Sequence, residues 1–268
     1  MKELEINIEE MRQKQPLIHN ITNQVVMNFT ANGLYAMGAA PVMAHAKEEV
    51  ADMAQIADAV VLNIGTLTKE QVEAMIIAGK SANEKGVPVV LDPVGVGATK
   101  FRTDSARQII KEVDVSLIRG NAGEIASLAD IEVKVRGVEG NAALTPYAIA
   151  KEAFGKLNIP LAITGEEDVV IDKHNLYRLR NGNPILAKVT GTGCLLTAII
   201  ASFLTVQKNP IKAAVGAISS YNIAAEMAFT KSQLPGGFQV AFLDALYEIN
   251  EKKIRDGMIV ECEDNNGN

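Results

Sequence analysis

Short, nearly continuous apolar runs alternate along the chain with longer segments whose apolar residues recur at helical spacing. Such runs are typical of strands in a parallel sheet, because those strands are covered on both faces. The strand-like runs are residues 59–64, 87–92, 116–118 and 160–164. The helix-like segments between them are residues 68–85, 103–113 and 145–157. Alternating strands and helices predict βαβ units and a mostly parallel central sheet.

The pattern changes in the C-terminal part of the chain. Residues 168–172 and 176–179 are separated by Lys173-His174-Asn175, which predicts a hairpin and therefore some antiparallel strands at the edge of the sheet. From Gly193 onward the spacing is mostly helical. The expected helices are residues 195–206, 210–229 and 238–255, and the polar tail 261–268 is expected to fray.

No linker, repeat or low-complexity segment interrupts the sequence, which favours one domain over residues 1–268. Residues 130–144 carry no motif and are expected to form a variable surface excursion.

Composition narrows the function. The net charge is −6, which argues against nucleic acid or an anionic membrane as the default partner. Tryptophan is absent and aromatic residues make up 4% of the chain, too few for a nucleic-acid stacking platform. Residues 1–14 carry charges of both signs, and the longest uncharged apolar run, 194–206, is shorter than a membrane span of about 20 residues. A soluble cytoplasmic protein is expected.

The two cysteines, Cys194 and Cys262, fit no zinc or redox spacing, although the sequence leaves a disulfide open. The chain also lacks the GxxxxGK[ST] loop of P-loop kinases and a GxGxxG after its first strand.

The strongest local signal is the glycine-rich stretch 188–194 before a long apolar helix. Glycines let the backbone approach a ligand closely, and the first amides of a helix have no intrahelical partner. Gly191, Gly193 and the start of the helix could therefore bind a phosphoryl group in transfer. An ordinary loop capping a buried helix explains the same residues equally well.

Two further candidates follow predicted strands, where open α/β sheets bind ligands. Asp92, before Pro93, could hold Mg²⁺ through water, or could be a turn or N-cap aspartate. Asn121 and Glu124 share a helix face and could serve a Mg²⁺–phosphate complex, with Arg119 neutralising phosphate charge. Asn121 and Glu124 could equally form a capping box, and the two roles could coexist.

The segment 19–23 precedes a helix expected to begin near Val25. Asn23 is a good N-cap, and His19 alone is more typical of a structural histidine than of a catalyst.

Seven short motifs are spread over nearly the whole chain. They are His-Asn-Ile-Thr-Asn at 19–23, Asn-Phe-Thr-Ala-Asn-Gly at 28–33, Pro-Val-Met-Ala at 41–44, Leu-Asn-Ile-Gly-Thr-Leu at 62–67, Leu-Asp-Pro-Val-Gly at 91–95, Ile-Arg-Gly-Asn at 118–121 with Glu124, and Thr-Gly-Thr-Gly-Cys at 190–194. Taken together, they resemble the hydroxyethylthiazole kinase family of the ribokinase-like superfamily. The last motif alone is shared by ribokinase-like proteins in general.

The resemblance implies a three-layer α/β/α fold, Mg²⁺-ATP as phosphoryl donor and 4-methyl-5-(2-hydroxyethyl)thiazole as acceptor. It also implies a homotrimer whose active sites lie at subunit interfaces. Matched residue by residue, it implies a metal and phosphate role for Asp92 and Glu124, nucleotide contacts for Arg119, Thr164 and Asn121, thiazole contacts for Met43, Gly191, Asn23 and Gly65, and a catalytic role for Gly191, Gly193 and Cys194.

Cys194 stands where many related sugar kinases carry an aspartate base, and thiazole kinases share the cysteine. A thiol is a poorer base unless its pKa is lowered, as a helix N-terminus can do. We therefore expect positioning and charge stabilisation to supply most of the rate. Two alternatives stay open: a related vitamin kinase acting on a pyrimidine or pyridoxal-type alcohol, and a nucleotide- or thiazole-binding protein without useful turnover.

Overall fold

The computed structural model describes residues 6–132 and 145–265, and its strands form one sheet of nine. The strand order is β2-β1-β3-β4-β5-β6-β7-β8-β9. Neighbours from β2 through β6 run parallel, and β6 through β9 run antiparallel. The strands are β1 (Leu17–Ile21), β2 (Ala40–Val42), β3 (Ala59–Asn63), β4 (Val89–Asp92), β5 (Leu117–Asn121), β6 (Leu161–Thr164), β7 (Asp168–Ile171), β8 (Asn175–Leu179) and β9 (Val260–Asp264).

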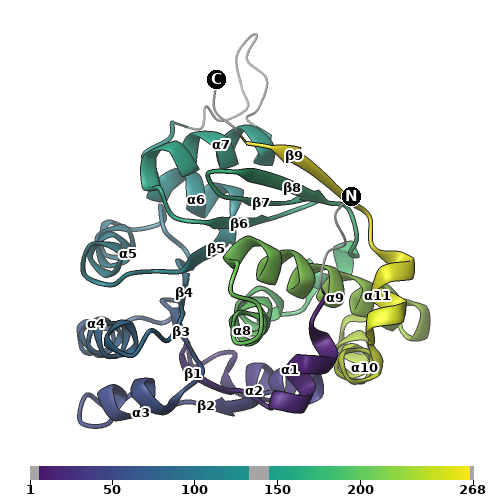
Figure 1. Ribbon diagram of the computed structural model, residues 1–268, viewed down its shortest axis with the longest axis horizontal. Helices are drawn as coiled ribbons and strands as arrows, with labels where there is room; N and C mark the ends of the chain where they lie inside the picture. The colour runs from purple at the N-terminus through teal and green to yellow at the C-terminus, as the bar shows by residue number, and fades with distance from the viewer. Residues whose placement is uncertain (1–5, 133–144, 266–268) are drawn as a thin grey trace.

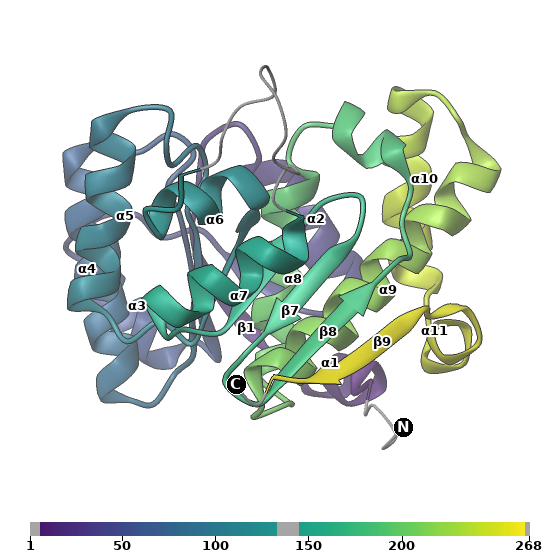
Figure 2. The same ribbon diagram turned by 90° about the horizontal axis from the view of Figure 1, so that it is seen from above.

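Helices cover both faces of the sheet, giving three layers (Figures 1 and 2). One layer contains α3 (Val50–Ile56), α4 (Lys69–Glu84), α5 (Lys100–Glu112), α6 (Ala122–Leu128) and α7 (Pro146–Leu157). The other contains α1 (Ile8–Lys14), α2 (Met27–Met37), α8 (Thr192–Leu204), α9 (Pro210–Lys231), α10 (Pro235–Glu248) and α11 (Glu251–Gly257). A short 3-10 helix, η1 (Pro184–Lys188), precedes α8.

Each face of the sheet has its own apolar core. Successive side chains of a strand point to opposite faces, so Val61 of β3 packs with the α8 layer while Val60 and Leu62 pack with the α4 layer. Both cores need apolar residues from the same strands. This explains the nearly continuous apolar runs of the sequence.

The predicted mostly parallel sheet with antiparallel edge strands is confirmed, and so is the hairpin of β7 and β8. Two expectations were wrong. The tail does not fray at 261–264, because these residues belong to β9 and pair with β8. The single helix expected over 238–255 is two helices, because the chain leaves α10 at Ile249 in an extended conformation and Asn250 caps α11.

The expected surface excursion at 130–144 lies, from residue 133 on, outside the described residues. In the part of the chain that is described, no helix is both long and apolar enough to cross a membrane. The cytoplasmic location and the single domain stay predictions.

Candidate functional site

Four neighbouring parallel strands carry polar residues that face α8, at or near their carboxyl ends. Val61, Val90, Leu117 and Ala162 belong to the core on the α8 side of the sheet. Two residues further along the same strands stand Asn63, Asp92, Arg119 and Thr164, which strand alternation places on the same face. Because the carboxyl ends of parallel strands lie at one edge of the sheet, these polar side chains lie together beside the start of α8.

A relay of hydrogen bonds runs across this edge. Asn63 Nδ2 donates to Asp92 Oδ2 over 2.7 Å, and Thr197 Oγ1 of α8 donates to the same oxygen over 2.9 Å. Asn63 Oδ1 accepts from Asn23 Nδ2 at 2.9 Å and from the Gly65 amide at 3.0 Å. Asn23 Nδ2 also approaches Cys194 Sγ at 3.4 Å. The relay therefore joins the loop after β1 to the carboxylate of β4.

Asp92 is not the local turn or N-cap aspartate that the sequence left open, because its carboxylate contacts Asn63 and Thr197 from distant segments. Its side chain is fully buried, and burial raises the pKa of Asp92 to about 6, against the charge of Arg119 and these two hydrogen bonds. Oδ1 has no hydrogen-bond partner among the described residues. A buried carboxylate oxygen without a donor suits a cation.

Glu124 forms the capping box with Asn121. Glu124 Oε2 accepts from the Asn121 amide at 2.9 Å, and Asn121 Oδ1 accepts from the Glu124 amide at 2.9 Å. Glu124 Oε1 accepts from the Gly95 amide at 2.8 Å and so ties α6 to the loop after Asp92. The capping reading is thus correct. It leaves room for a second role, because each carboxylate oxygen can accept more than one bond.

Among the described residues no three His, Cys, Asp or Glu side chains form a cluster that could hold a metal. Mg²⁺ needs no such cage, since it keeps several waters and uses one or two carboxylates with substrate phosphates.

The start of α8 lies close to Arg119. Gly191 is the N-cap of α8 with a φ of 90°, which favours glycine, and a Cβ there would lie 2.8 Å from Val26 Cγ1. A Cβ at Gly193 would lie 2.6 Å from Arg119 Nη1. Glycine at 193 therefore lets the guanidinium approach the first turn of the helix. Arg119 Nη2 also donates to Thr164 Oγ1.

A cavity of about 600 Å³ opens beside these residues. It is lined by Arg119, Thr164, Gly165, Glu166, Asp168, Arg180, Asn181, Gly182, Asn183, Pro184, Leu186, Ala187, Thr192, Gly193, Leu196, Tyr221 and Asn222. Of the predicted nucleotide contacts, Arg119 and Thr164 are in this wall, whereas Asn121 is not. Asp92, Cys194 and the predicted thiazole contacts Met43, Asn23, Gly65 and Gly191 are outside it.

The predicted thiazole contacts fall into two groups. A Cβ at Gly65 would lie 2.8 Å from Asn23 Cγ, so these two residues touch. Met43 lies just after β2, and its carbonyl accepts from His45 Nδ1 at 3.2 Å. No hydrogen bond within the described residues joins Met43 to the relay. Asn23 is not a helix cap, because α2 begins after Val26 and the Asn23 amide is used in the relay.

Cys194 and His19 show how burial alters reactive side chains. Burial and the nearby Asp92 raise the pKa of the Cys194 thiol to about 11, and the helix start does not reverse this. Both cysteines are free thiols. His19 is fully buried and its Nε2 donates to the Ala44 carbonyl at 2.8 Å, as expected of a structural histidine.

Sequence reasoning missed several residues that organise the site. Asn63 is the clearest, and its signal was a polar residue ending an apolar strand. Arg102 donates to the carbonyls of Ile64, Gly65 and Val94 at 2.8 to 2.9 Å and fastens the loops after β3 and β4 together. Tyr221 of α9 donates to the Thr192 carbonyl at 2.6 Å. Nothing in the local sequence marked Arg102 or Tyr221.

At this edge of the mostly parallel sheet, carboxylate and amide side chains face a helix that begins with glycines, an arrangement suited to an anionic ligand. A family model described as the hydroxyethylthiazole kinase family matches residues 8–252. The chain belongs to the hydroxyethylthiazole kinase family.

Solved structures agree with this membership. A hydroxyethylthiazole kinase protein from Pyrococcus horikoshii OT3 is 40% identical over 98% of this chain and 100% of its own, with a TM-score of 0.88. More distant structures share the fold alone. The pyridoxal kinase from Staphylococcus aureus in complex with AMP-PCP is 15% identical, covers 92% of this chain and 98% of its own, and has a TM-score of 0.59. A ribokinase-like superfamily protein from Enterococcus faecalis V583 is 14% identical over 88% of each chain, with a TM-score of 0.61.

Proposed function

We propose that this protein transfers the γ-phosphoryl group of ATP to the hydroxyl of 4-methyl-5-(2-hydroxyethyl)thiazole. The single observation that carries the proposal is the membership of the hydroxyethylthiazole kinase family, which covers residues 8–252. The geometry supports it, because a cavity of about 600 Å³ meets a glycine-rich helix start, and the buried carboxylate of Asp92 stands at the same edge of the sheet, outside the cavity wall.

The nucleotide occupies the cavity. Arg119 and Thr164 contact its phosphates, and the free amides at the start of α8 near Gly193 receive the group in transfer. Asn121 contributes through the capping box that orders the start of α6. The family resemblance implies a catalytic role for Gly191, Gly193 and Cys194, and these three residues lie together at this helix start.

The alcohol lies on the other side of α8, against Asn23, Gly65, Gly191 and Met43. In this pose its hydroxyl is near Cys194. Its oxygen forms a bond to the γ-phosphorus as the bond to the ADP leaving group breaks, and its proton passes to an oxygen of the transferred phosphoryl group and then to solvent. The thiol of Cys194 stays protonated near neutral pH, because its pKa is raised to about 11. Cys194 therefore positions the hydroxyl, and the rate comes from alignment and charge stabilisation.

Asp92 and Glu124 would hold Mg²⁺, which supplies charge neutralisation of the phosphates when bound. The buried Asp92 Oδ1, which has no hydrogen-bond partner among the described residues, supports this role. Asn63 and Thr197 fix the other oxygen of Asp92, so the carboxylate keeps one orientation.

The active assembly is a homotrimer with sites at subunit interfaces. The support is the family resemblance together with large apolar side chains exposed on α2 and α10. Tyr35 is 63% exposed, Val240 64% and Tyr247 73%. Exposed apolar groups of this size on neighbouring helices are typical of an interface.

A substrate panel tests the function. The purified protein is incubated with ATP, Mg²⁺ and, separately, the thiazole alcohol, a hydroxymethylpyrimidine and pyridoxal, and the product is measured by mass spectrometry. Phosphorylation of the thiazole alcohol above the other two is expected. Preference for the pyrimidine or pyridoxal would indicate a related vitamin kinase. Calorimetric binding of both ligands without product would indicate a binding protein.

A further inference from the structure

The turn between β6 and β7 forms one wall of the cavity described above. The buried carboxylate of Asp168 closes this turn. Asp168 Oδ1 accepts from the Gly165 amide at 3.0 Å, and Asp168 Oδ2 accepts from Asn222 Nδ2 of α9 at 2.7 Å. Asp168 is 6% exposed and Asn222 4%. Both residues line the cavity together with Thr164 and Gly165.

Closing the turn does not by itself require a carboxylate at position 168. Burying a carboxylate costs free energy unless it is well hydrogen-bonded. Burial raises the pKa of Asp168, while the Gly165 amide, Asn222 and the charge of Arg119 oppose that rise. A neutral side chain accepting from Gly165 would close the turn without this cost.

What a carboxylate adds is a second strong acceptor, and it points at α9. Asn222 Nδ2 donates both to Asp168 Oδ2 and to the Asn181 carbonyl at 2.9 Å. Asn181 Nδ2 in turn donates to Glu226 Oε1 of α9 at 3.2 Å. The turn, the chain after β8 and α9 are thereby fastened into one wall, although they are far apart in sequence.

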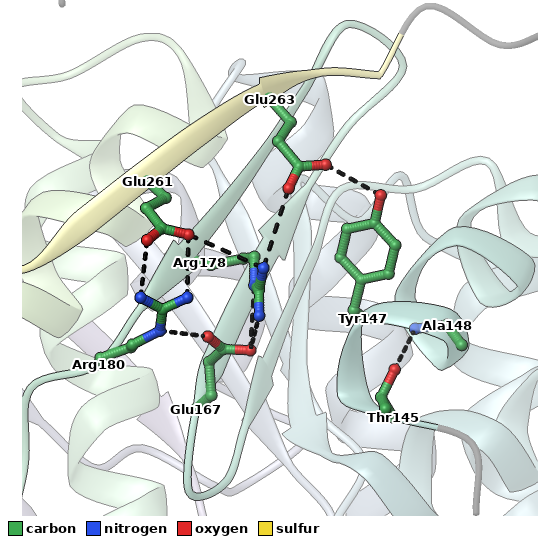
Figure 3. A network of polar contacts seen from close by, with 8 residues as sticks. All are labelled: Thr145, Tyr147, Ala148, Glu167, Arg178, Arg180, Glu261 and Glu263. Atoms are coloured by element: carbon green, nitrogen blue, oxygen red, sulfur yellow. Dashed lines mark hydrogen bonds and ion pairs between the residues drawn. The ribbon is translucent and has the colours of Figure 1, made fainter. Parts of the chain in front are cut away.

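The neighbouring Glu167 fastens the same turn from the opposite face of the strand. Figure 3 shows its carboxylate between two guanidinium groups. Glu167 accepts from Arg178 Nε at 3.1 Å and from Arg180 Nε at 2.9 Å, and Glu261 of β9 holds Arg180 in a bidentate pair. These groups are partly exposed, so the ion pairs contribute little rigidity compared with the buried bonds of Asp168.

We propose that Asp168 is a positioning residue for the nucleotide. Its bonds to the Gly165 amide and to Asn222 hold Gly165 and the adjoining Thr164 in place in the cavity wall. This inference rests on the proposed function, because it takes the cavity as the nucleotide site. It follows that loss of the Asp168–Asn222 bond weakens nucleotide binding and leaves the alcohol side of α8 unaffected.

Asp168→Asn tests the proposal with little change in shape. The new amide can accept from Gly165, but its NH₂ then faces the NH₂ of Asn222, so one buried bond is lost. The control is Asp172→Asn on the same hairpin, where Asp172 Oδ1 accepts from the amides of His174 and Asn175 at 2.8 Å, outside the cavity wall.

We expect Asp168→Asn to raise the KM for ATP and the Kd for AMP-PCP about tenfold, which matches the loss of one buried bond to a charged group. The KM for the alcohol should stay within about twofold, and Asp172→Asn should change neither constant. Asn222→Ala should act like Asp168→Asn, and it decides the question if Asp168→Asn does not fold.

Calorimetry with AMP-PCP and steady-state kinetics give the readouts. Equal affinity of the wild type and both cavity variants would overturn the inference alone. If Asp172→Asn weakened nucleotide binding as much as Asp168→Asn, the inference would also be overturned, because the effect would then not be specific to the carboxylate in the cavity wall. No AMP-PCP binding by the wild-type protein would overturn the proposed function itself.

Discussion

Asn63 and Asp92 stand opposite each other at the ends of β3 and β4, and the amide of Asn63 donates to the Asp92 carboxylate over 2.7 Å. The other end of the same amide accepts from Asn23 and from the Gly65 backbone. One buried side chain thus sets the orientation of the proposed metal carboxylate and of the proposed alcohol pocket together. The contacts with Asp92 and Gly65 leave the Asn63 amide only one orientation, because the carboxylate only accepts and the backbone N–H only donates.

Replacing Asn63 should therefore impair catalysis without a direct contact to either substrate. We expect Asn63→Ala to lower kcat by about 10- to 100-fold, the usual loss for a residue that orients a metal-binding group. The measurement is steady-state turnover with the thiazole alcohol at saturating ATP and Mg²⁺. Asn83→Ala is the control, because Asn83 makes a similar bridge to the backbone of Asp114 at 2.8 and 2.9 Å, away from the site. Equal turnover by both variants would contradict the assigned role.

The sequence predicted the strands β3 to β8, because each had to satisfy two cores, but it did not predict β1, β2 or β9. It predicted the residues at the strand ends, such as Asp92 and Arg119, because polar groups after an apolar run are visible locally. It failed where a side chain is used over a long sequence separation. Asn23 resembles a helix cap in isolation, and its use in the relay depends on Asn63, which is remote in sequence but adjacent in the sheet.

The last strand was missed for a related reason. Residues 260–264 are mostly exposed and charged, so no apolar pattern marks them. They form a strand because β8 has a free edge. Arg178 of β8 also attracts Glu261 and Glu263, and Arg180 just after β8 attracts Glu261 (Figure 3). The sequence also could not decide whether the start of α8 lowers the pKa of the Cys194 thiol. In the structure, burial raises this pKa instead.

Asp92 should destabilise the metal-free protein near neutral pH. Its pKa is raised from 3.8 to about 6, so the folded state binds the proton more tightly than the unfolded state does. Stability from this group is therefore present below pH 4 and is lost as pH rises to about 6, by up to about 3 kcal/mol. Asp92→Asn removes this pH-dependent loss of stability, and it also removes the charge that would bind the metal. We expect the variant to be inactive, with a Tm advantage over wild type that grows between pH 4 and pH 7 in excess chelator. An advantage that is constant with pH would refute this.

A side chain at position 193 should displace Arg119, because a Cβ there would lie 2.6 Å from Arg119 Nη1. Gly193→Ala forces the guanidinium away from the start of α8, and a displacement of about 1 Å in a catalytic group can cost about 100-fold in rate. We expect kcat/KM for ATP to fall by about 10- to 100-fold. Gly155→Ala in α7 is the matched control, since a Cβ there meets nothing within 4 Å and should stabilise the helix by about 0.5–1 kcal/mol. Unchanged kinetics of Gly193→Ala would remove Arg119 from the proposed phosphate site.

The proposed trimer should depend on the apolar side chains of α2 and α10. We expect the double variant Tyr35→Lys with Tyr247→Lys to dissociate in sedimentation velocity at micromolar concentration, because charge on both helices opposes burial of either. Ile56→Lys on α3 is the control, with 67% exposure on the opposite layer. A wild-type protein that sediments as a fully active monomer would exclude a required trimer.

Cys194 offers the sharpest test of how the hydroxyl is activated. Burial and Asp92 raise the pKa of its thiol to about 11, so at pH 8 only about one thiol in a thousand is ionised. A general base typically contributes about 10²- to 10⁴-fold, and a group that is almost never ionised cannot supply it. We therefore expect Cys194→Ala to lose less than about 100-fold in single-turnover phosphorylation of the thiazole alcohol. Over pH 6 to 9 the wild type should show no inflection that Cys194→Ala lacks. Cys194→Asp should remain active, because Asn23 beside the sulfur can donate to a carboxylate. A folded Cys194→Ala protein that binds both substrates and forms no product would make the thiolate the base after all.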